Sequence, residues 1–467
     1  MTHPPVPGLF PAAADRRRSE ALLAAALDGL DRRIAAGPVA PTLDMSRFRE
    51  ELAEVDFAAP RALDALLPWV IESLERGVTQ ITHPRYFGLF NPAPTFPAQC
   101  ADRIVAAFNP QLASATTSPA AVAMEAHVIR AVAARAGLPA DAGGHFTSGG
   151  AEANATALTC ALTVASPDFA RLGARCFDGP PVFYISREAH LAWIKIAHQA
   201  GIGREAVRLV RTDGQGRLHA PSLADAIATD RAQGAVPFMV AATAGTTAAG
   251  MIDPLPDCAA IARDHGLWLH VDAAWGGAAI ASPQRRGVLA GLELADSVTI
   301  DAHKWFATTM GCGMFLTRRP AVLSAAFQVS TGYMPSNSVS VDPYVNSIQW
   351  SRRFLGLRLF LALAAAGWDG YAAHVERAIG LAGLLARRLG SLGWRVANDS
   401  PLAVLCLEPP EGSADPATIV RRVLAAGTAW ISVAMFEGRP VIRTCVTHGA
   451  TAVEDVEKLV GALEAAR

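Results

Sequence analysis

The chain of 467 residues is longer than a single hydrophobic core usually supports, so we expect one large domain with one or two smaller units. Apolar residues make up 51% of the chain and charged residues 18%, a balance that excludes wholesale disorder. The net charge of −1 gives no basic field for nucleic acid or an anionic membrane, and seven Cys without a CxxC pair argue against a disulfide framework or a thiolate zinc site.

The first hundred residues have the pattern of helices interrupted by proline. Apolar residues at helical spacing predict helices over residues 19–34 and 62–77. The first eleven residues contain no apolar stretch of signal-peptide length, so we expect a cytoplasmic protein. The most apolar helical candidate, residues 354–368, contains Arg358 and is shorter than the roughly 18–20 residues that a membrane span requires.

A proline-rich aromatic stretch over residues 83–97 follows the predicted N-terminal helices. Proline at this density predicts an irregular, extended path. Its aromatic residues either pack beneath a loop or line a pocket.

The middle of the chain alternates short apolar runs with helical patterns. Continuous apolar strands separated by helices predict a mostly parallel sheet that is covered on both faces, in an α/β fold. The later pattern predicts a small α+β unit, and we expect three parts: 1–100, 101–368 and 369–467. The predicted strands of the sheet are residues 182–185, 207–210, 238–242, 267–271, 298–300 and 314–316, and the α+β unit comprises helices 371–389 and 453–465 with strands 402–407, 430–433 and 441–445.

An acid and a lysine follow two neighbouring apolar runs. Asp272 comes directly after one predicted strand, and Lys304 lies shortly after the next, beside Trp305 and Phe306. In open α/β sheets ligands bind at the carboxyl ends of strands, so both side chains are expected at one edge. A partly desolvated lysine favours Schiff-base chemistry, and a carboxylate that keeps a pyridine nitrogen protonated is what pyridoxal phosphate (PLP) requires. Taken alone, Asp272 has a simpler but less favoured explanation as a helix N-cap after a strand.

A glycine loop, Ser148-Gly149-Gly150, lies in the segment 146–154, which leads into a helical stretch predicted over residues 155–164. Glycines allow the backbone to approach an anion, and a helix N-terminus offers free N–H groups. In isolation the loop is more simply an ordinary turn before a capped helix. Together with Lys304 and Asp272 it predicts a site for the cofactor phosphate.

Two further polar residues follow strands at the same edge. His190 lies shortly after the run 182–185, where an imidazole could stack on a pyridine ring, although such a residue is more often a surface or capping histidine. Thr246 belongs to the hydroxyl-rich turn that follows the run 238–242.

These segments resemble the group II PLP-dependent amino-acid decarboxylases, the family of aromatic-L-amino-acid, histidine and glutamate decarboxylases. The strongest pieces are His-Val-Asp-Ala-Ala-Trp-Gly, which contains Asp272, and Asp-Ala-His-Lys-Trp, which contains Lys304. The resemblance implies fold type I of PLP enzymes, the fold of aspartate aminotransferase, and α-decarboxylation of an L-amino acid. It further implies a homodimer with shared active sites, in which the N-terminal helices clasp the partner.

The resemblance also implies roles for individual residues. Lys304 would hold the cofactor as a Schiff base, Asp272 would pair with the pyridine nitrogen, and His190 would stack on the ring. Tyr333, in a Ser-, Gly- and Pro-rich segment, would protonate Cα after decarboxylation. The remaining implied contacts are Gly150, Ala151 and His303 at the phosphate and Thr246 and Ala274 against the ring.

Two positions depart from the family pattern. Asp301 stands where the aromatic decarboxylases usually have Asn, and a carboxylate beside a phosphate dianion is electrostatically poor. We therefore expect Asp301 to point at His303 or at a backbone group. Ala151 stands where a hydroxyl residue is common, which leaves more of the phosphate binding to backbone N–H groups.

The substrate is weakly encoded in the sequence. Phe87, Phe90 and Pro92 resemble the segment that packs on aromatic substrates, with a contribution from Trp69, so we expect an aromatic or bulky L-amino acid. Arg85 is the exception that would favour an acidic one. Arg352 and Arg353 match an arginine pair of the family, which a structural ion pair explains equally well.

Other functions stay open. The same fold supports an aminotransferase, an aldolase or a C–S lyase, and Arg443 is the candidate for binding an α-carboxylate in an aminotransferase. A PLP-binding regulatory protein would need a DNA-binding appendage and basic charge. A metal hydrolase built on His270, Asp272 and His303 lacks further ligands in the sequence.

Overall fold

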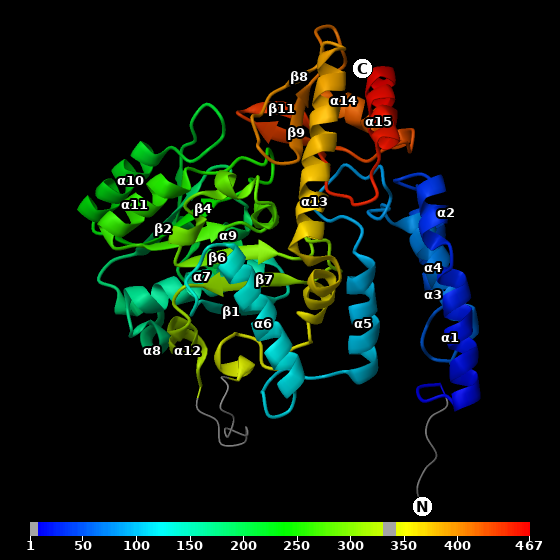
Figure 1. Cartoon of the computed structure of the whole chain (residues 1–467), viewed down its shortest axis with the longest axis horizontal. Coiled ribbons are helices and arrows are strands. Elements are labelled where there is room, and N and C mark those ends of the chain that lie inside the picture. Colours follow the sequence, from blue (N-terminus) through cyan, green and yellow to red (C-terminus); the bar gives the residue numbers. More distant parts are fainter. Residues whose placement is uncertain (1–7, 330–341) are drawn as a thin grey trace, which may run out of the picture.

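The central sheet of the computed structural model holds seven strands in the order β1-β7-β6-β5-β4-β2-β3 (Figure 1), and the model describes residues 8–329 and 342–467. Strands β6, β5, β4, β2 and β3 run parallel, whereas β7 runs antiparallel to both β1 and β6. The prediction of a mostly parallel sheet is therefore confirmed. The strands are β1 (Gly143–Thr147), β2 (Pro181–Ser186), β3 (Val207–Val210), β4 (Val236–Thr243), β5 (Trp268–Asp272), β6 (Ser297–Asp301) and β7 (Gly313–Thr317).

Helices cover both faces of this sheet, because its strands are apolar on both sides. On β4, Val240 and Ala242 belong to the larger core, and Met239 and Ala241 belong to a second core on the opposite face. Helices α7 (Gly150–Ala165), α9 (Ala192–Gln199) and α12 (Ala321–Phe327) pack on the second core. The larger core includes residues of α6 (Pro119–Arg135), α10 (Ala220–Ala232) and α11 (Leu255–His265).

Strand β1 was missed in the sequence because Phe146 is its one large apolar side chain. Its sequence, Gly-Gly-His-Phe-Thr, has neither an apolar run nor a clear alternation. The strand forms because it pairs antiparallel with β7 along its whole length. This pairing delivers the chain directly to the glycine loop, residues 148–150.

The N-terminal helices form a layer beside α5 at one side of the body (Figure 1). The single helix predicted over residues 19–34 is wrong: the structure has two helices, separated at Gly29, whose φ of +65° lies in the left-handed region. Helices α1, α2 and α3 bury none of their residues in this chain. The elements of this layer are α1 (Ala13–Leu27), α2 (Leu30–Ala36), α3 (Met45–Ala53) and α4 (Leu63–Gly77), and the helix beside it is α5 (Phe96–Phe108).

Helix α13 (Leu357–Gly390) leads from the large sheet to a second, four-stranded antiparallel sheet of order β10-β11-β9-β8. The helix is interrupted at Gly367, where φ is +64° and ψ is 178°. In residues 8–329 and 342–467, no helix is both long and apolar enough to cross a membrane. The remaining elements of the described chain are β8 (Arg395–Val396), β9 (Val404–Glu408), α14 (Pro416–Ala425), β10 (Ser432–Phe436), β11 (Arg439–Cys445) and α15 (Val453–Ala466). The short helix α8 (Phe169–Leu172) and six 3-10 turns complete the described elements.

A buried ion pair ties three of these elements together behind the glycine loop. The Arg352 guanidinium donates to Glu125 of α6 at 2.6 Å, and both side chains are 4% exposed. Arg352 also donates to the backbone oxygen of Phe146 in β1, and Glu125 accepts the N–H of Gly356 just before α13. Arg353 instead pairs with Asp102 near the surface. The ion-pair explanation thus fits both arginines.

Glu125→Ala should lower the free energy of unfolding by about 3–5 kcal/mol, because it leaves the Arg352 charge buried without a partner. Urea denaturation monitored by tryptophan fluorescence measures the change. Glu457→Ala serves as the control, because its ion pair with Arg388 is exposed and should contribute less than about 1 kcal/mol. Equal effects of the two substitutions would contradict the buried-pair argument.

Three buried histidines should make the fold sensitive to mild acid. Burial lowers the pKa of His83 to about 4, of His145 to about 3 and of His270 to about 4. Between pH 6.5 and 4 the unfolded chain therefore binds more protons than the folded chain, so the free energy of unfolding falls as the pH falls. Each group contributes at most about 1.4 kcal/mol per pH unit.

Urea titrations at pH 7 and pH 5 measure this slope. His145→Leu should flatten this slope, because it removes a ring whose pKa burial lowers to about 3 and whose two nitrogens have no hydrogen-bond partner among the described residues. The exposed His198 provides the control, since His198→Ala should leave the slope unchanged. Identical slopes for His145→Leu and the unaltered protein would contradict the prediction.

Candidate active site

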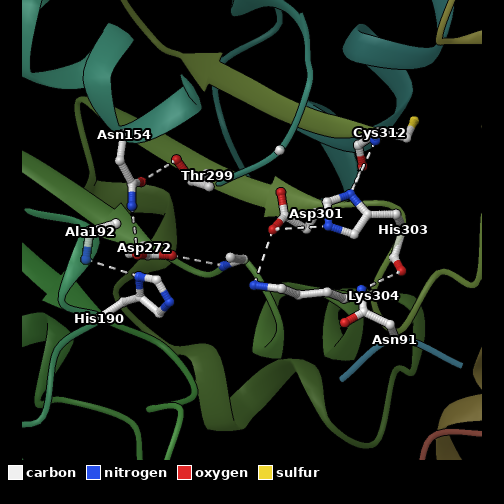
Figure 2. Close-up of polar contacts among 12 residues, drawn as sticks. Asn91, Asn154, His190, Ala192, Asp272, Thr299, Asp301, His303, Lys304 and Cys312 are labelled. Atoms are coloured by element: carbon white, nitrogen blue, oxygen red, sulfur yellow. Dashed lines mark hydrogen bonds and ion pairs between the residues drawn. The ribbon is translucent and has the colours of Figure 1, made fainter. Parts of the chain in front are cut away.

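A cavity of about 360 Å³ lies at the carboxyl edge of the large sheet. It brings together the ends of β5 and β6, the glycine loop and the loop after β2, as the alternation of strands and helices predicted. Figure 2 shows His190, Asp272 and Lys304 pointing into the same space. The described residues that line the cavity include Phe90, Ser148, Gly149, Gly150, Ala151, Asn154, His190, Thr243, Gly245, Thr247, Asp272, Ala274, Trp275, Asp301, His303, Lys304, Met310 and Gly311.

Lys304 is held by Asp301 on the turn that follows β6. Its Nζ lies 3.1 Å from Asp301 Oδ2, and the lysine side chain is 21% exposed whereas the carboxylate is 2% exposed. Asp301 Oδ2 is also 3.8 Å from His303 Nε2, which agrees with the expectation that Asp301 points at His303. Asp301 thus balances the lysine charge inside the cavity.

The His303 ring is fixed by backbone. Its Nδ1 lies 3.1 Å from the N–H and 3.0 Å from the carbonyl oxygen of Cys312, so one backbone unit orients the ring in either tautomer. Burial lowers the pKa of His303, and the Asp301 carboxylate opposes part of that effect. Neutral His303 can therefore bind an anion as a hydrogen-bond donor with little charge of its own.

Asp272 ends β5 and is 6% exposed. Its Oδ1 accepts the N–H of Ala274 at 3.1 Å, and its Oδ2 accepts from Asn154 Nδ2 at 2.7 Å (Figure 2). These two donors hold the carboxylate from behind while it faces the cavity. A cationic ring nitrogen is the type of group that such a carboxylate can bind.

The glycine loop delivers the N-terminus of α7 to the cavity. A Cβ on Gly150 would lie 2.9 Å from Asp301 Oδ2 and 3.3 Å from the Ala274 side chain, so glycine is required for this close approach. The loop is anchored by Ser148, whose N–H and hydroxyl both donate to Glu152. The first N–H groups of α7 have no carbonyl partners within the helix, which makes this end an anion site.

Of the two polar residues His190 and Thr246, His190 lines the cavity and Thr246 does not appear in the described lining. His190 is exposed to the cavity, and its Nδ1 accepts the N–H of Ala192 at 3.2 Å, which places the ring hydrogen on Nε2. The Thr246 hydroxyl accepts the N–H of Met251 at 3.0 Å within its turn. Its neighbours Gly245 and Thr247 line the cavity, whereas Thr246 is not among the described residues that do so.

One wall of the cavity is a stack of aromatic rings. Phe90 stacks on Trp275 with ring centres 4.4 Å apart, and Trp275 stacks on Trp305 at 5.0 Å. Phe87 is fully buried in the core and Pro92 is also buried; neither is among the described lining residues. Trp69 stacks on Phe48 in the N-terminal layer, and of the four predicted aromatic-segment residues Phe90 alone reaches the described lining.

Arg443 lies behind this wall. Its guanidinium carbon is 4.6 Å from the Phe90 ring centre, within the range of a cation–π contact. Its Nε donates to the Thr247 carbonyl and its Nη1 to the Gly88 carbonyl, and its Nη2 is buried without a partner in the described structure. Arg85 instead lies beside His83, with nitrogens 3.4 Å apart. Of these two arginines, Arg443 is therefore the one that lies next to the site, where it contacts the lining residues Phe90 and Thr247.

Two further predictions concern Tyr333 as a catalytic acid and His270 as a metal ligand. Tyr333 lies outside the described residues, so its role stays a prediction. His270, considered as a metal ligand, directs its nitrogens at Ser297 and Asn154. Among residues 8–329 and 342–467, no group of three or more His, Cys, Asp or Glu side chains has the arrangement to hold a metal ion.

Comparison with known proteins decides what kind of site this is. Residues 50–400 match the model of the pyridoxal-dependent decarboxylase conserved domain. The chain belongs to this family. It is therefore an amino-acid decarboxylase that uses pyridoxal phosphate, as the resemblance implied.

Relatives with different substrates are similar to this chain. An aromatic-L-amino-acid decarboxylase of Bacillus atrophaeus is 28% identical over 92% of this chain and 90% of its own length. The human cysteine sulfinic acid decarboxylase is 34% identical over 66% of this chain and 63% of its own length. The structure of Oryza sativa TDC with PLP and tryptamine superposes with a TM-score of 0.91 at 23% identity, covering 100% of this chain and 99% of the other. The chain thus has fold type I.

The cavity fits the cofactor that the family uses. It combines an amine on Lys304, a carboxylate on Asp272 and an anion site at the glycine loop, and a Cβ at Gly150 would close that approach. These are the three groups that an aldehyde, a pyridine nitrogen and a phosphate require. His303, Ala151 and Ala274 complete the lining around them.

Asn154 and Thr299 are the site residues that the sequence patterns did not reveal. Asn154 interrupts an Ala-rich helix four residues after Gly150, which puts both residues on one helix face. Thr299 donates to Asn154 Oδ1 at 2.7 Å from the middle of β6. An amide side chain on the same helix face as Gly150, in an Ala-rich helix, is the pattern that could have identified Asn154.

Lys304→Ala should abolish the visible absorbance of the bound cofactor, because the ε-amine is the attachment point. The chain has three lysines, Lys195, Lys304 and Lys458, so the assignment can be mapped unambiguously. Borohydride reduction of the loaded protein followed by peptide mass spectrometry should place the cofactor on residue 304. Lys195→Ala is the control and should keep the absorbance; cofactor recovered on Lys195 or Lys458 would contradict the assignment.

Proposed function

We propose that this protein removes the α-carboxyl group of an aromatic or otherwise bulky L-amino acid, giving the amine and CO₂. The observation that carries the proposal is the single cavity that holds Lys304, Asp272 and His190 against a wall built on Phe90. Family membership supports decarboxylation, and the aromatic wall supports the substrate class.

Four groups divide the work of holding the cofactor. Lys304 would attach the aldehyde, Asp272 would bind the ring nitrogen, and the glycine loop with His303 would bind the phosphate. When bound, PLP supplies an electron sink for the bond that breaks at Cα. The Asp301 carboxylate, 3.1 Å from Lys304 Nζ, would stabilise the protonated amine whenever Lys304 is not attached to the cofactor.

His190 would lie against the ring and orient the substrate. With Nδ1 accepting from Ala192, its Nε2–H is free to donate into the cavity, where a substrate carboxylate can accept it. The bond aligned perpendicular to the ring is the one that breaks, so the position of this carboxylate selects the reaction. Tyr333 remains our proposal for the acid that protonates Cα.

The substrate side chain would pack on Phe90. Because Trp275 and Trp305 back this ring, the wall is flat and rigid, which suits an aromatic side chain. Thr247 and Met310 border the same space.

One observation favours a second candidate, an acidic amino acid. Arg443 Nη2 is buried without a partner in the described structure and lies behind Phe90. A substrate carboxylate or sulfinate would satisfy it. An aminotransferase would use the same arginine for an α-carboxylate and would release a keto acid.

We further propose that the protein works as a cytoplasmic homodimer of three-part chains, divided at about residues 100 and 368. Helices α1, α2 and α3 bury none of their residues within one chain, so the described part of this N-terminal layer has apolar side chains available for a partner copy. Leu9, Phe10 and Phe57 are among the exposed ones.

A substrate screen tests the proposal. Purified enzyme loaded with PLP is given L-tryptophan, L-tyrosine, L-phenylalanine, L-glutamate, L-aspartate and L-cysteine sulfinate, and CO₂, amine and keto acid are quantified. We expect amine and CO₂ in equal amounts, with the highest kcat/KM for an aromatic substrate.

The substitution Arg443→Met distinguishes an enzyme for aromatic amino acids from one for acidic amino acids. It should change kcat/KM for aromatic substrates by less than about tenfold, whereas an enzyme for acidic substrates should lose about 100-fold or more when a buried charged partner is removed. Preference for the acidic substrates would refute the aromatic assignment. Keto acid without CO₂ would refute decarboxylation.

A further inference from the structure

A chain of buried hydrogen bonds ends on Asp272 through Asn154, which itself lines the cavity. Asn154 Nδ2 donates to Asp272 Oδ2 at 2.7 Å, and Asn154 Oδ1 lies 3.1 Å from His270 Nε2. His270 Nδ1 lies 2.8 Å from Ser297 Oγ, which accepts from Trp268 Nε1 at 2.9 Å. We call these four residues, Trp268, Ser297, His270 and Asn154, the Asn154 relay.

The chemistry of the groups fixes the direction of every bond. A carboxylate only accepts, so the amide nitrogen of Asn154 must face Asp272 and its oxygen must face His270. His270 therefore carries its hydrogen on Nε2, and Nδ1 accepts from the Ser297 hydroxyl. Ser297 Oγ in turn accepts the Trp268 N–H. Each donor in the relay points toward Asp272.

The direction of these hydrogen bonds matters because all four residues of the relay are buried. His270 and Ser297 are fully buried, Asn154 is 2% exposed and Trp268 is 3% exposed, so water does not replace a lost bond. Burial also lowers the pKa of His270 to about 4, which keeps the ring neutral with a single hydrogen near neutral pH. Aligned hydrogen bonds polarise one another, so the relay favours negative charge on Asp272.

The Thr299 hydroxyl reinforces the amide orientation. It donates to Asn154 Oδ1 at 2.7 Å (Figure 2), so a flipped amide would face two donors with its own N–H groups. Asn154 also lies one helical turn after Gly150 on α7. One rigid helix thus carries the anion site at its N-terminus and the amide that holds Asp272.

We propose that Asn154, assisted by His270 and Thr299, is a positioning residue that fixes the Asp272 carboxylate and stabilises its charge toward the pyridine nitrogen of the cofactor. This inference rests on the proposed role of Asp272. It goes beyond that role because it assigns the strength of the Asp272 contact to the residues that hold the carboxylate in place, and not to the carboxylate alone.

The test measures cofactor binding in full-length variants. Each protein is stripped of cofactor and titrated with PLP, and the pH at which the visible absorbance of the loaded protein changes is recorded. Asn154→Leu should weaken PLP binding about tenfold or more and move that pH by about one unit. Asp272→Asn is the reference and should show the larger change in both quantities.

A matched pair of substitutions separates the relay from general core damage. Thr299 and Thr317 are both fully buried, and they lie on adjacent strands β6 and β7. The Thr317 hydroxyl donates to the Asp296 carbonyl instead of Asn154. Thr299→Val should weaken PLP binding severalfold, whereas Thr317→Val should leave it within about twofold. This pair also keeps the test decisive if Asn154→Leu does not fold.

A cofactor analogue with C–H in place of the ring nitrogen supplies the chemical control. If the relay acts through Asp272, the difference in affinity between the unaltered protein and the Thr299→Val or Asn154→Leu variant should shrink to about twofold or less with this analogue. An equal loss for PLP and the analogue would show a packing defect and overturn the relay.

Different results would contradict the role of Asp272 and the role of the Asn154 relay. If Asp272→Asn leaves both the PLP affinity and the pH of the absorbance change unaltered, the role of Asp272 is wrong. If Asp272→Asn changes them while Asn154→Leu and Thr299→Val do not, the role of Asp272 stands and the relay is overturned.

Discussion

The candidate active site depends on compensating two buried carboxylates that lie where neighbouring strands of the sheet end. Asp272 closes β5 and Asp301 closes β6, and both carboxylates are at most 6% exposed. A buried charge is costly unless hydrogen bonds or an opposite charge compensate it. Lys304 compensates Asp301, and two N–H donors compensate Asp272. The sheet edge can present reactive groups because each of them already has a partner.

Much of this arrangement follows from the sequence, because parallel strands leave clear patterns. The runs before Asp272 and Lys304 are short and mainly apolar, as expected for strands that are buried on both faces, although they also contain His270, Ser297 and Thr299. Glycines before an Ala-rich helix predicted an anion site in the same way, and the structure places this loop at the cavity. These features are local in sequence, so a reader of the chain alone can find them.

The rest could not be predicted because it depends on contacts between distant segments. Strand β1 exists through its pairing with β7, and its own residues carry little pattern. Phe87 and Phe90 look equivalent in an aromatic stretch, yet one is in the core and the other lines the cavity. Asn154 and Asp272 are 118 residues apart, and their contact appears only when α7 packs on the sheet. Side-chain direction, which decides these roles, is a property of the packed fold.

The scarcity of lysine limits where the aldehyde of the cofactor can react with this protein. Of 41 basic residues three are lysines, and Lys195 and Lys458 are on the surface. Guanidinium groups stay protonated and do not condense with aldehydes near neutral pH. An arginine-rich exterior thus offers a reactive aldehyde few competing amines, so adventitious adducts on the surface should be rare. Amine-directed labels or immobilisation supports would, for the same reason, attach to this protein at very few places.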